Sequence, residues 1–227
     1  MTQTPMPFVN YPVMKNVRTI LNNKTYVSIA LLSILSFFMV GFRVVYTQSP
    51  FYKFMIWNLF LALIPLIVSS IILHYKQKSL KVLIIPILFW LLFFPNAPYL
   101  ITDIVHHSGN SRILFWYDFL VLTIFALLGL FITVESLRHI HQVLLERMNK
   151  KASWALISFI IFISSVGIYI GRVLRWNSWD AFVNPYGVVI TILYRIAHPQ
   201  TYPDVYFMTI GLSVLIFASY LFYSGKK

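Results

Sequence analysis

Six long apolar runs divide the chain, and they constrain its fold more than any other feature of the sequence. They cover approximately residues 26–46, 54–75, 80–94, 116–137, 153–174 and 205–223. A helix needs about 20 apolar residues to cross a hydrocarbon core of roughly 30 Å, and all runs except the third meet that length. We therefore predict an all-α fold: an integral membrane helical bundle with about six transmembrane helices.

Composition supports a membrane protein and narrows the chemistry. Of the 227 residues, 59% are hydrophobic and only 11% are charged, which is too apolar for one water-soluble core. The net charge of +12 comes mostly from Lys and Arg in the short links between runs, where they set topology, so we expect no nucleic-acid partner. The absence of cysteine excludes disulfides, thiolate catalysis and cysteine-based zinc sites.

The positive charges also predict the orientation. With six spans, 12 of the 18 Lys and Arg residues fall on the side of the two termini and 6 on the other. Because positive residues favour the cytoplasm, both termini are expected there. The first apolar run is expected to be a retained span. The predicted organisation is a cytoplasmic segment over residues 1–25, one transmembrane domain over 26–223 and a cytoplasmic tail over 224–227.

Two segments on the extracytoplasmic side are too long to be simple turns. Pro95 and Pro98 interrupt the third run, and residues 95–115 are expected to form a short interfacial helix with Asn96 as its cap. Residues 184–197 are expected to form a second one, opened by Pro185, that lies in the interface or folds back into the bundle.

Asp103 and His106 are three residues apart, and Asp103 and His107 are four apart, so on a helix the carboxylate shares a face with an imidazole. That pairing suits a general base or a divalent-metal site, and Asp118 at the head of the fourth span would join it. The alternative is structural: Asp103 pairs with an arginine, the histidines sit at the interface and Asp118 caps a helix.

Arg172 and Arg175 share a helical face at the extracytoplasmic end of the fifth span. Small hydrogen-bonding residues follow closely: Asn177, Ser178 and Asp180. Two guanidinium groups in this setting would bind a phosphate or carboxylate, such as a lipid headgroup. Two alternatives stay open: the arginines neutralise Asp103, Asp118 or Asp180 in a buried network, or they extend to the headgroups.

The remaining polar residues have simpler interpretations. Asn58, inside the second run, is expected to bond to Asn96 or Asn177. Glu135, Arg138, His139 and His141 are interpreted as a solvated helix end at the inner side of the fourth span. Five tryptophans are expected to form an interfacial belt: Trp57, Trp90, Trp116, Trp176 and Trp179.

Four stretches give the chain a family resemblance. They are Pro95-Asn96-Ala97-Pro98-Tyr99-Leu100-Ile101-Thr102-Asp103, Trp57-Asn58-Leu59-Phe60-Leu61-Ala62, Trp116-Tyr117-Asp118, and Gly171-Arg172-Val173-Leu174-Arg175-Trp176-Asn177-Ser178-Trp179-Asp180. With them the chain, from about residue 54 to 223, resembles the bacterial membrane family DUF1361, a domain of unknown function. The resemblance implies a multi-pass protein of the bacterial cytoplasmic membrane and no particular activity.

Three functional hypotheses follow. In the first, Asp103, His106 and Asp118 are catalytic residues or ligands of a divalent metal, acting on or binding a lipid or lipid-linked anion. Its substrate-binding residues would be Arg172, Arg175, Asn177, Asp180, Asn58 and Asn96. The second is a transporter of a small solute or ion, although polar residues gather mainly on one side. The third is a non-catalytic membrane scaffold; membrane lipids are the expected partners in each case.

Overall fold

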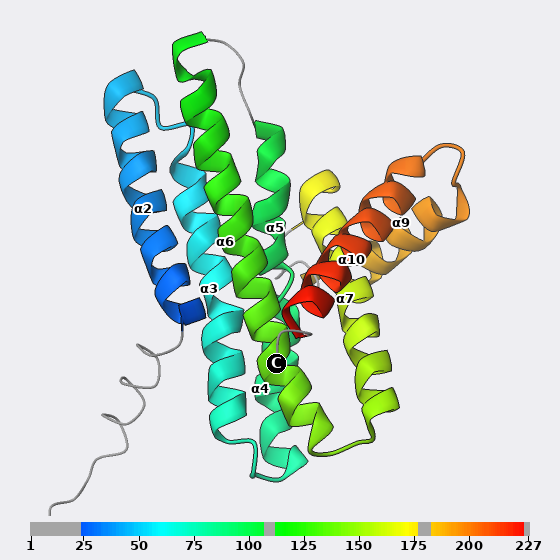
Figure 1. Ribbon diagram of the computed structural model, residues 1–227. Coiled ribbons are helices and arrows are strands. Elements are labelled where there is room, and N and C mark those ends of the chain that lie inside the picture. Colours follow the sequence, from blue (N-terminus) through cyan, green and yellow to red (C-terminus); the bar gives the residue numbers. More distant parts are fainter. Residues whose placement is uncertain (1–23, 107–111, 177–182, 225–227) are drawn as a thin grey trace, which may run out of the picture.

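The computed structural model describes residues 24–106, 112–176 and 183–224, and this part of the chain is helical without any strand (Figure 1). The elements are α2 (Lys24–Thr47), α3 (Lys53–His74), α4 (Leu80–Phe93), α5 (Asn96–Thr102), the 3-10 helix η1 (Asp103–His106), α6 (Arg112–Leu145), α7 (Lys150–Val173), α9 (Pro185–Ala197) and α10 (Pro203–Ser224). Six segments are long and apolar enough to cross a membrane, which confirms the predicted all-α, six-span bundle.

The third apolar run is short because Pro95 and Pro98 interrupt it, but the third span continues past both prolines. Phe94 and Pro95 both keep right-handed helical dihedral angles, so α5 and η1 continue from α4 as one apolar span over Leu80–Val105 (Figure 1). Buried residues of α5 pack against α6, so protein rather than lipid surrounds the backbone at the proline break. Of the segment 95–115, which was expected to form a short interfacial helix, residues 96–106 are helical but continue the third span, residues 112–115 begin α6, and residues 107–111 lie outside the described part.

Asn96 also differs from its predicted role. The cap position of α5 is Pro95, and no side chain bonds to the free amides there. The Asn96 side-chain amide instead donates to the carbonyl of Phe93 at 2.9 Å. Because the helix continues through this point, there is no fresh helix start for Asn96 to cap.

Helix α6 is the central helix of the bundle. Its 34 residues extend about 50 Å at 1.5 Å per residue, well beyond the predicted 116–137 run. It contacts α2, α3, α5, α7 and α10, and the two hydrophobic cores lie along it. Gly129 allows α5 to approach closely, since a Cβ there would lie 2.7 Å from both the Ala97 carbonyl oxygen and the Leu100 Cβ.

The bundle has two ends, which we name by their residues. At the Lys76 end, the α3–α4 and α6–α7 connections lie together (Figure 1): Lys76 pairs with Glu146, and Arg147 donates to the carbonyl of Lys78 at 3.0 Å. At the opposite end, the Asp103 end, lie η1 and the start of α6. The described part of α2 begins, and that of α10 ends, beside the lower half of α6 and not at the Lys76 end (Figure 1).

The predicted short helix over residues 184–197 is confirmed as α9. The Asn184 side chain accepts a hydrogen bond from the Gly187 amide at 3.0 Å, and Pro185 occupies the first turn. No residue of α9 is buried, and the helix lies beside α10 at the edge of the molecule (Figure 1).

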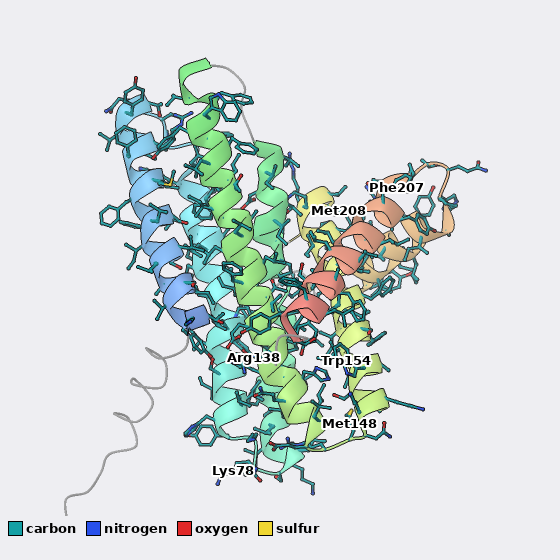
Figure 2. The ribbon with its side chains drawn as sticks, viewed as in Figure 1. Lys78, Arg138, Met148, Trp154, Phe207 and Met208 are labelled. Atoms are coloured by element: carbon teal, nitrogen blue, oxygen red, sulfur yellow. The ribbon has the colours of Figure 1, made fainter. Side chains whose placement is uncertain are left out.

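Large apolar side chains cover the outer surface of the bundle, as Figure 2 shows for Phe207 on α10, which is 78% exposed. Such a surface requires lipid as its solvent. Trp57 and Trp116 are exposed, as a belt residue would be. Trp90 is not a belt residue: it is fully buried, and its indole nitrogen donates to the Ser136 hydroxyl at 2.7 Å.

Candidate functional site

The carboxylate of Asp103 joins three spans at the Asp103 end. Asp103 is the first residue of η1, directly after α5, and it is fully buried. Arg172, near the end of α7, forms an ion pair with it, and the Asn58 side-chain amide from α3 donates to its Oδ2 at 3.2 Å. Asn58 thus bonds to Asp103 and not to Asn96, because an ionised carboxylate is the stronger acceptor.

Arg172 is held from several directions. Its Nε donates to the Thr102 hydroxyl at 2.9 Å, and its guanidinium carbon lies 4.2 Å from the centre of the Tyr99 ring. A planar guanidinium can satisfy an ion pair, a hydrogen bond and a cation–π contact at once. The Asp103–Arg172 pair therefore corresponds to the alternative in which an arginine neutralises Asp103.

Asp118 has an arginine of its own. Arg43 from α2 donates to both carboxylate oxygens, at 2.6 and 2.9 Å, and lies over the Tyr52 ring at 5.2 Å. Asp118 is 1% exposed, so this is a buried bidentate pair. Sequence reasoning used Arg43 only as a topology charge; its position inside an apolar run was the signal that it needs a buried partner.

The predicted metal site is not completed by the residues that the structure describes. Within them, no three His, Asp or Glu side chains lie close enough to hold a metal ion. The backbone of His106 lies in η1, but its side chain falls outside the described part, as do Asn177 and Asp180. The catalytic and metal-binding roles of Asp103, His106 and Asp118 thus stay predictions.

An open groove of about 1100 Å³ lies between α3, the third span, α7 and α9. Its polar and aromatic lining includes Trp57, Asn58, Asn96, Tyr99, Arg172, Arg175 and Trp176. Its apolar lining includes Leu61, Leu91, Leu92, Ile163, Val166, Ile170, Val188 and Ile192. The structure therefore brings four of the predicted substrate-binding residues, Asn58, Asn96, Arg172 and Arg175, to one surface.

The turn after α7 places Arg175 and Trp176 in that lining. Arg175 adopts a left-handed backbone conformation with φ of 58°, and the Trp176 amide bonds back to the Ile170 carbonyl at 3.3 Å. A non-glycine residue in this region costs roughly 1–2 kcal/mol. The Arg175 side chain is exposed, and no carboxylate in the described part of the chain pairs with it.

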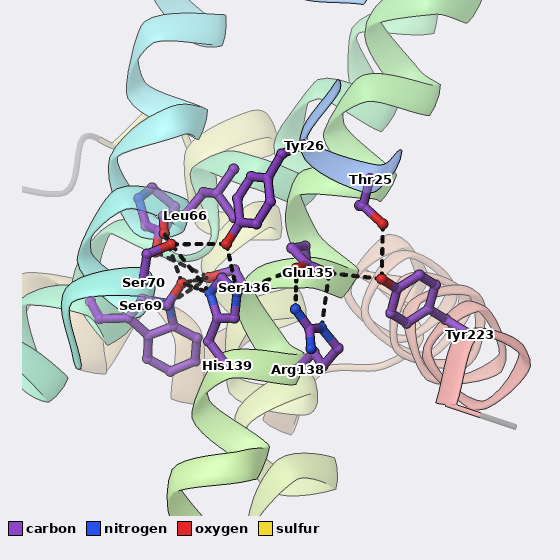
Figure 3. A network of polar contacts seen from close by, with 12 residues as sticks. Thr25, Tyr26, Leu66, Ser69, Ser70, Glu135, Ser136, Arg138, His139 and Tyr223 are labelled. Carbon is purple, nitrogen blue, oxygen red and sulfur yellow. Dashed lines mark hydrogen bonds and ion pairs between the residues drawn. The ribbon is translucent and has the colours of Figure 1, made fainter. Parts of the chain in front are cut away.

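A second polar region, which sequence reasoning misinterpreted, surrounds Glu135 and His139 on α6 (Figure 3). Glu135, His139 and His141 are all buried, so this is not a solvated helix end. The sequence was misleading because α6 continues past the predicted end of its apolar run, and because α2 and α10 cover it there.

The contacts around Glu135 and His139 connect four helices. Glu135 accepts from the Arg138 Nε at 3.0 Å and from the Tyr223 hydroxyl at 2.9 Å, and its Oε1 lies 3.3 Å from the His139 Nε2 (Figure 3). The His139 ring also contacts Tyr26 from α2 and Ser69 from α3. Two consecutive serines within the second apolar run, Ser69 and Ser70, were the sequence signal for a partner at this depth.

The fold and these buried ion pairs define the class of protein: a multi-pass integral membrane protein built as a helical bundle, with a groove that is apolar along its walls and cationic in part. The family model described as "Protein of unknown function (DUF1361)" matches residues 57–217, and the chain belongs to this family. No curated protein and no solved structure matches the chain.

Proposed function

We propose that the protein binds an anionic amphiphile, a lipid or lipid-linked molecule, in the groove. The observation that carries the proposal is that one open groove combines a long apolar wall with two arginines and two carboxamides. Apolar walls with a few placed polar groups are typical of ligand-binding sites. A ligand with acyl or prenyl chains and a phosphate or carboxylate headgroup matches both parts.

The two arginines have different tasks in this proposal. Arg172 neutralises Asp103 and is fixed by Thr102 and Tyr99, so it holds the groove's shape. Arg175 is exposed and lines the groove, so its guanidinium supplies the charge for the ligand's anion. Asn58 and Asn96 would orient the headgroup through hydrogen bonds.

We further propose that the protein lies in the bacterial cytoplasmic membrane with both termini in the cytoplasm. The support is the excess of Lys and Arg on the terminal side, 12 against 6. In that orientation the Asp103 end faces away from the cytoplasm, and the groove receives its ligand from the outer leaflet.

Binding to defined lipids tests the proposal. Purified full-length protein in nanodiscs is titrated with labelled phosphatidylglycerol and, separately, phosphatidylcholine. We expect preference for the anionic lipid, and Arg175→Ala should weaken its binding at least fivefold. Lys53→Ala is the matched control, because Lys53 is exposed but does not line the groove. Equal binding of both lipids, or an equal effect of both substitutions, contradicts the proposal.

Chemistry on the bound ligand by Asp103, His106 and Asp118, with or without a divalent metal, is a further proposal that rests on the sequence pattern. Transport is a second candidate function, and one observation favours it. The sequence argument against transport was that polar groups gather on one side, whereas Glu135 and His139 are buried deeper in the bundle. Uptake of candidate solutes into proteoliposomes, with and without a pH gradient, tests it.

A further inference from the structure

His139 lies in a buried polar region apart from the groove: none of the residues that contact its ring lines that groove. We propose that His139 is a reversible proton-binding site, with the proton bound and released at Nδ1 while Nε2 keeps its hydrogen. The proposal concerns a different part of the molecule from the lipid site and does not depend on it.

The Glu135 carboxylate favours a hydrogen on Nε2, whereas the Tyr26 hydroxyl suits either state of that nitrogen. Nε2 lies 3.3 Å from Oε1 of Glu135 and 2.8 Å from the Tyr26 hydroxyl. An ionised carboxylate only accepts hydrogen bonds, so a bare Nε2 would place two lone pairs against each other. With hydrogen on Nε2, the ring donates toward Glu135 and Tyr26, and Tyr26 can donate onward to the Ser70 hydroxyl at 3.2 Å.

The surroundings of Nδ1 suit either protonation state. Ser69 Oγ lies 3.0 Å from Nδ1, and Ser70 Oγ lies 3.5 Å from it. Each hydroxyl is also within bonding distance of the Leu66 carbonyl, at 3.0 and 2.8 Å. When Nδ1 is bare, Ser69 donates to it; when Nδ1 carries a proton, Ser69 turns to Leu66 and accepts. No heavy atom has to move, and no buried group loses its partner.

The charges around His139 allow the extra positive charge. Helix α6 supplies Glu135 and Arg138, α2 supplies Tyr26, and α3 supplies only serine hydroxyls; Tyr223 from α10 contacts Glu135. The Arg138 side chain is 17% exposed, whereas the Glu135 carboxylate that it pairs with is fully buried and also faces the imidazole. Burying ionisable side chains between membrane helices costs free energy. This cost favours the interpretation that proton binding at His139 has a function.

Ser69, His139 and Glu135 also follow the order of a nucleophile, base and acid. Ser69 is fully buried, however, and does not line the groove, so a substrate has no described route to it. A proton needs only the hydrogen-bonded route through Ser70 and Tyr26, both partly exposed between α2 and α3.

Nitrogen NMR of the histidine rings tests the proposal. Full-length protein with 15N-labelled histidine is placed in nanodiscs, and His139→Gln identifies the signals of this ring. As the pH is raised stepwise over the range in which the protein stays folded, we expect Nδ1 to change from protonated to bare while Nε2 stays protonated. A ring that keeps one state throughout, or that loses its proton from Nε2, overturns the proposal.

Two matched variants test why Nε2 keeps its hydrogen. Glu135→Gln replaces an obligate acceptor with an amide that can also donate, so we expect signals of mixed tautomers. Tyr26→Phe removes only the hydroxyl and should leave Nε2 protonated. The opposite pattern, with Tyr26→Phe altering the tautomer and Glu135→Gln leaving it unchanged, contradicts the role given to Glu135. The unmodified protein remains informative even if a variant does not fold.

Discussion

At the Asp103 end, two buried aspartates are each held by an arginine from another helix, Asp103 by Arg172 and Asp118 by Arg43. The pairs connect α2 to α6 and the third span to α7. Such pairs contribute little when compared with apolar packing, but losing one partner leaves a buried charge uncompensated. Arg172 and Arg43 are therefore needed for the stability of the fold, whether or not they also bind a ligand.

Arg172→Ala should therefore destabilise the protein by about 3 kcal/mol or more, because it removes the cation that pairs with the buried Asp103 carboxylate. Thermal unfolding in detergent and folded yield measure the loss. The double variant with Asp103→Leu and Arg172→Leu removes both charges and should recover part of that stability. Arg175→Ala, whose side chain is exposed, should unfold within a few degrees of the unmodified protein. Equal losses of stability in Arg172→Ala and Arg175→Ala contradict the assignment of a structural role to Arg172 and not to Arg175.

Trp90 offers a smaller residue-scale test. Trp90→Phe keeps most of the buried ring but removes the donor to Ser136, and we expect a loss of about 1 kcal/mol. Trp116→Phe, at a side chain 72% exposed, should change stability little. Denaturation midpoints of the two variants in the same detergent compare them. A larger loss from Trp116→Phe indicates that the outward-facing tryptophan anchors the protein and Trp90 does not.

Among the elements, the close approach of α5 to α6 positions Asp103. It depends on Gly129, where a Cβ would lie 2.7 Å from a backbone oxygen of α5. Small residues at helix crossings let membrane helices pack through their backbones. The residue that follows α5 is Asp103 itself, so the approach also fixes the ion pair with Arg172.

Gly129→Ala should destabilise the bundle by about 1–3 kcal/mol, the usual cost of overpacking. Gly41→Ala is the matched control, because a Cβ at Gly41 has no neighbouring atom within 4 Å. Since alanine is the better helix former, that control should be neutral or slightly stabilising. Thermal unfolding temperatures of both variants test this prediction. If Gly41→Ala is destabilised and Gly129→Ala is not, close packing at Gly129 does not explain the approach of α5 to α6.

The sequence predicted the elements better than their contacts. Apolar run lengths identified six spans, and Asn184 with Pro185 marked α9, because both signals are local. Run length failed for α6, whose polar segment from Glu135 to His141 is covered by α2 and α10, and for the third span, where packing of α5 against α6 accommodates the proline break. The partners of Asp103 and Asp118 come from residues about 70 positions distant in sequence, and no local pattern selects Arg172 or Arg43.

At the scale of the whole molecule, the groove and the His139 region occupy different parts of one bundle, so they can be perturbed separately. Val166→Trp should fill the groove and lower lipid affinity at least fivefold with the fold intact. Val214→Trp, on the exposed surface of α10, is the control and should bind as the unmodified protein does. Lipid titration measures the affinity of each variant, and circular dichroism checks that each variant is folded. Unchanged binding by Val166→Trp means that the ligand lies elsewhere.

The described parts of α2 and α10 contact α6 as far as His139 and His141, while α6 continues to Leu145, and this difference has a consequence for the surrounding bilayer. The four residues beyond His141 extend the central helix by about 6 Å. Exposed apolar residues on α4, including Leu80, Val82 and Ile85, continue the lipid-facing surface into that extension. The apolar surface of the described helices is thus staggered along the bundle, and we expect the adjacent leaflet to thin or slope to follow it. Membrane thickness is therefore expected to influence how this protein distributes and associates.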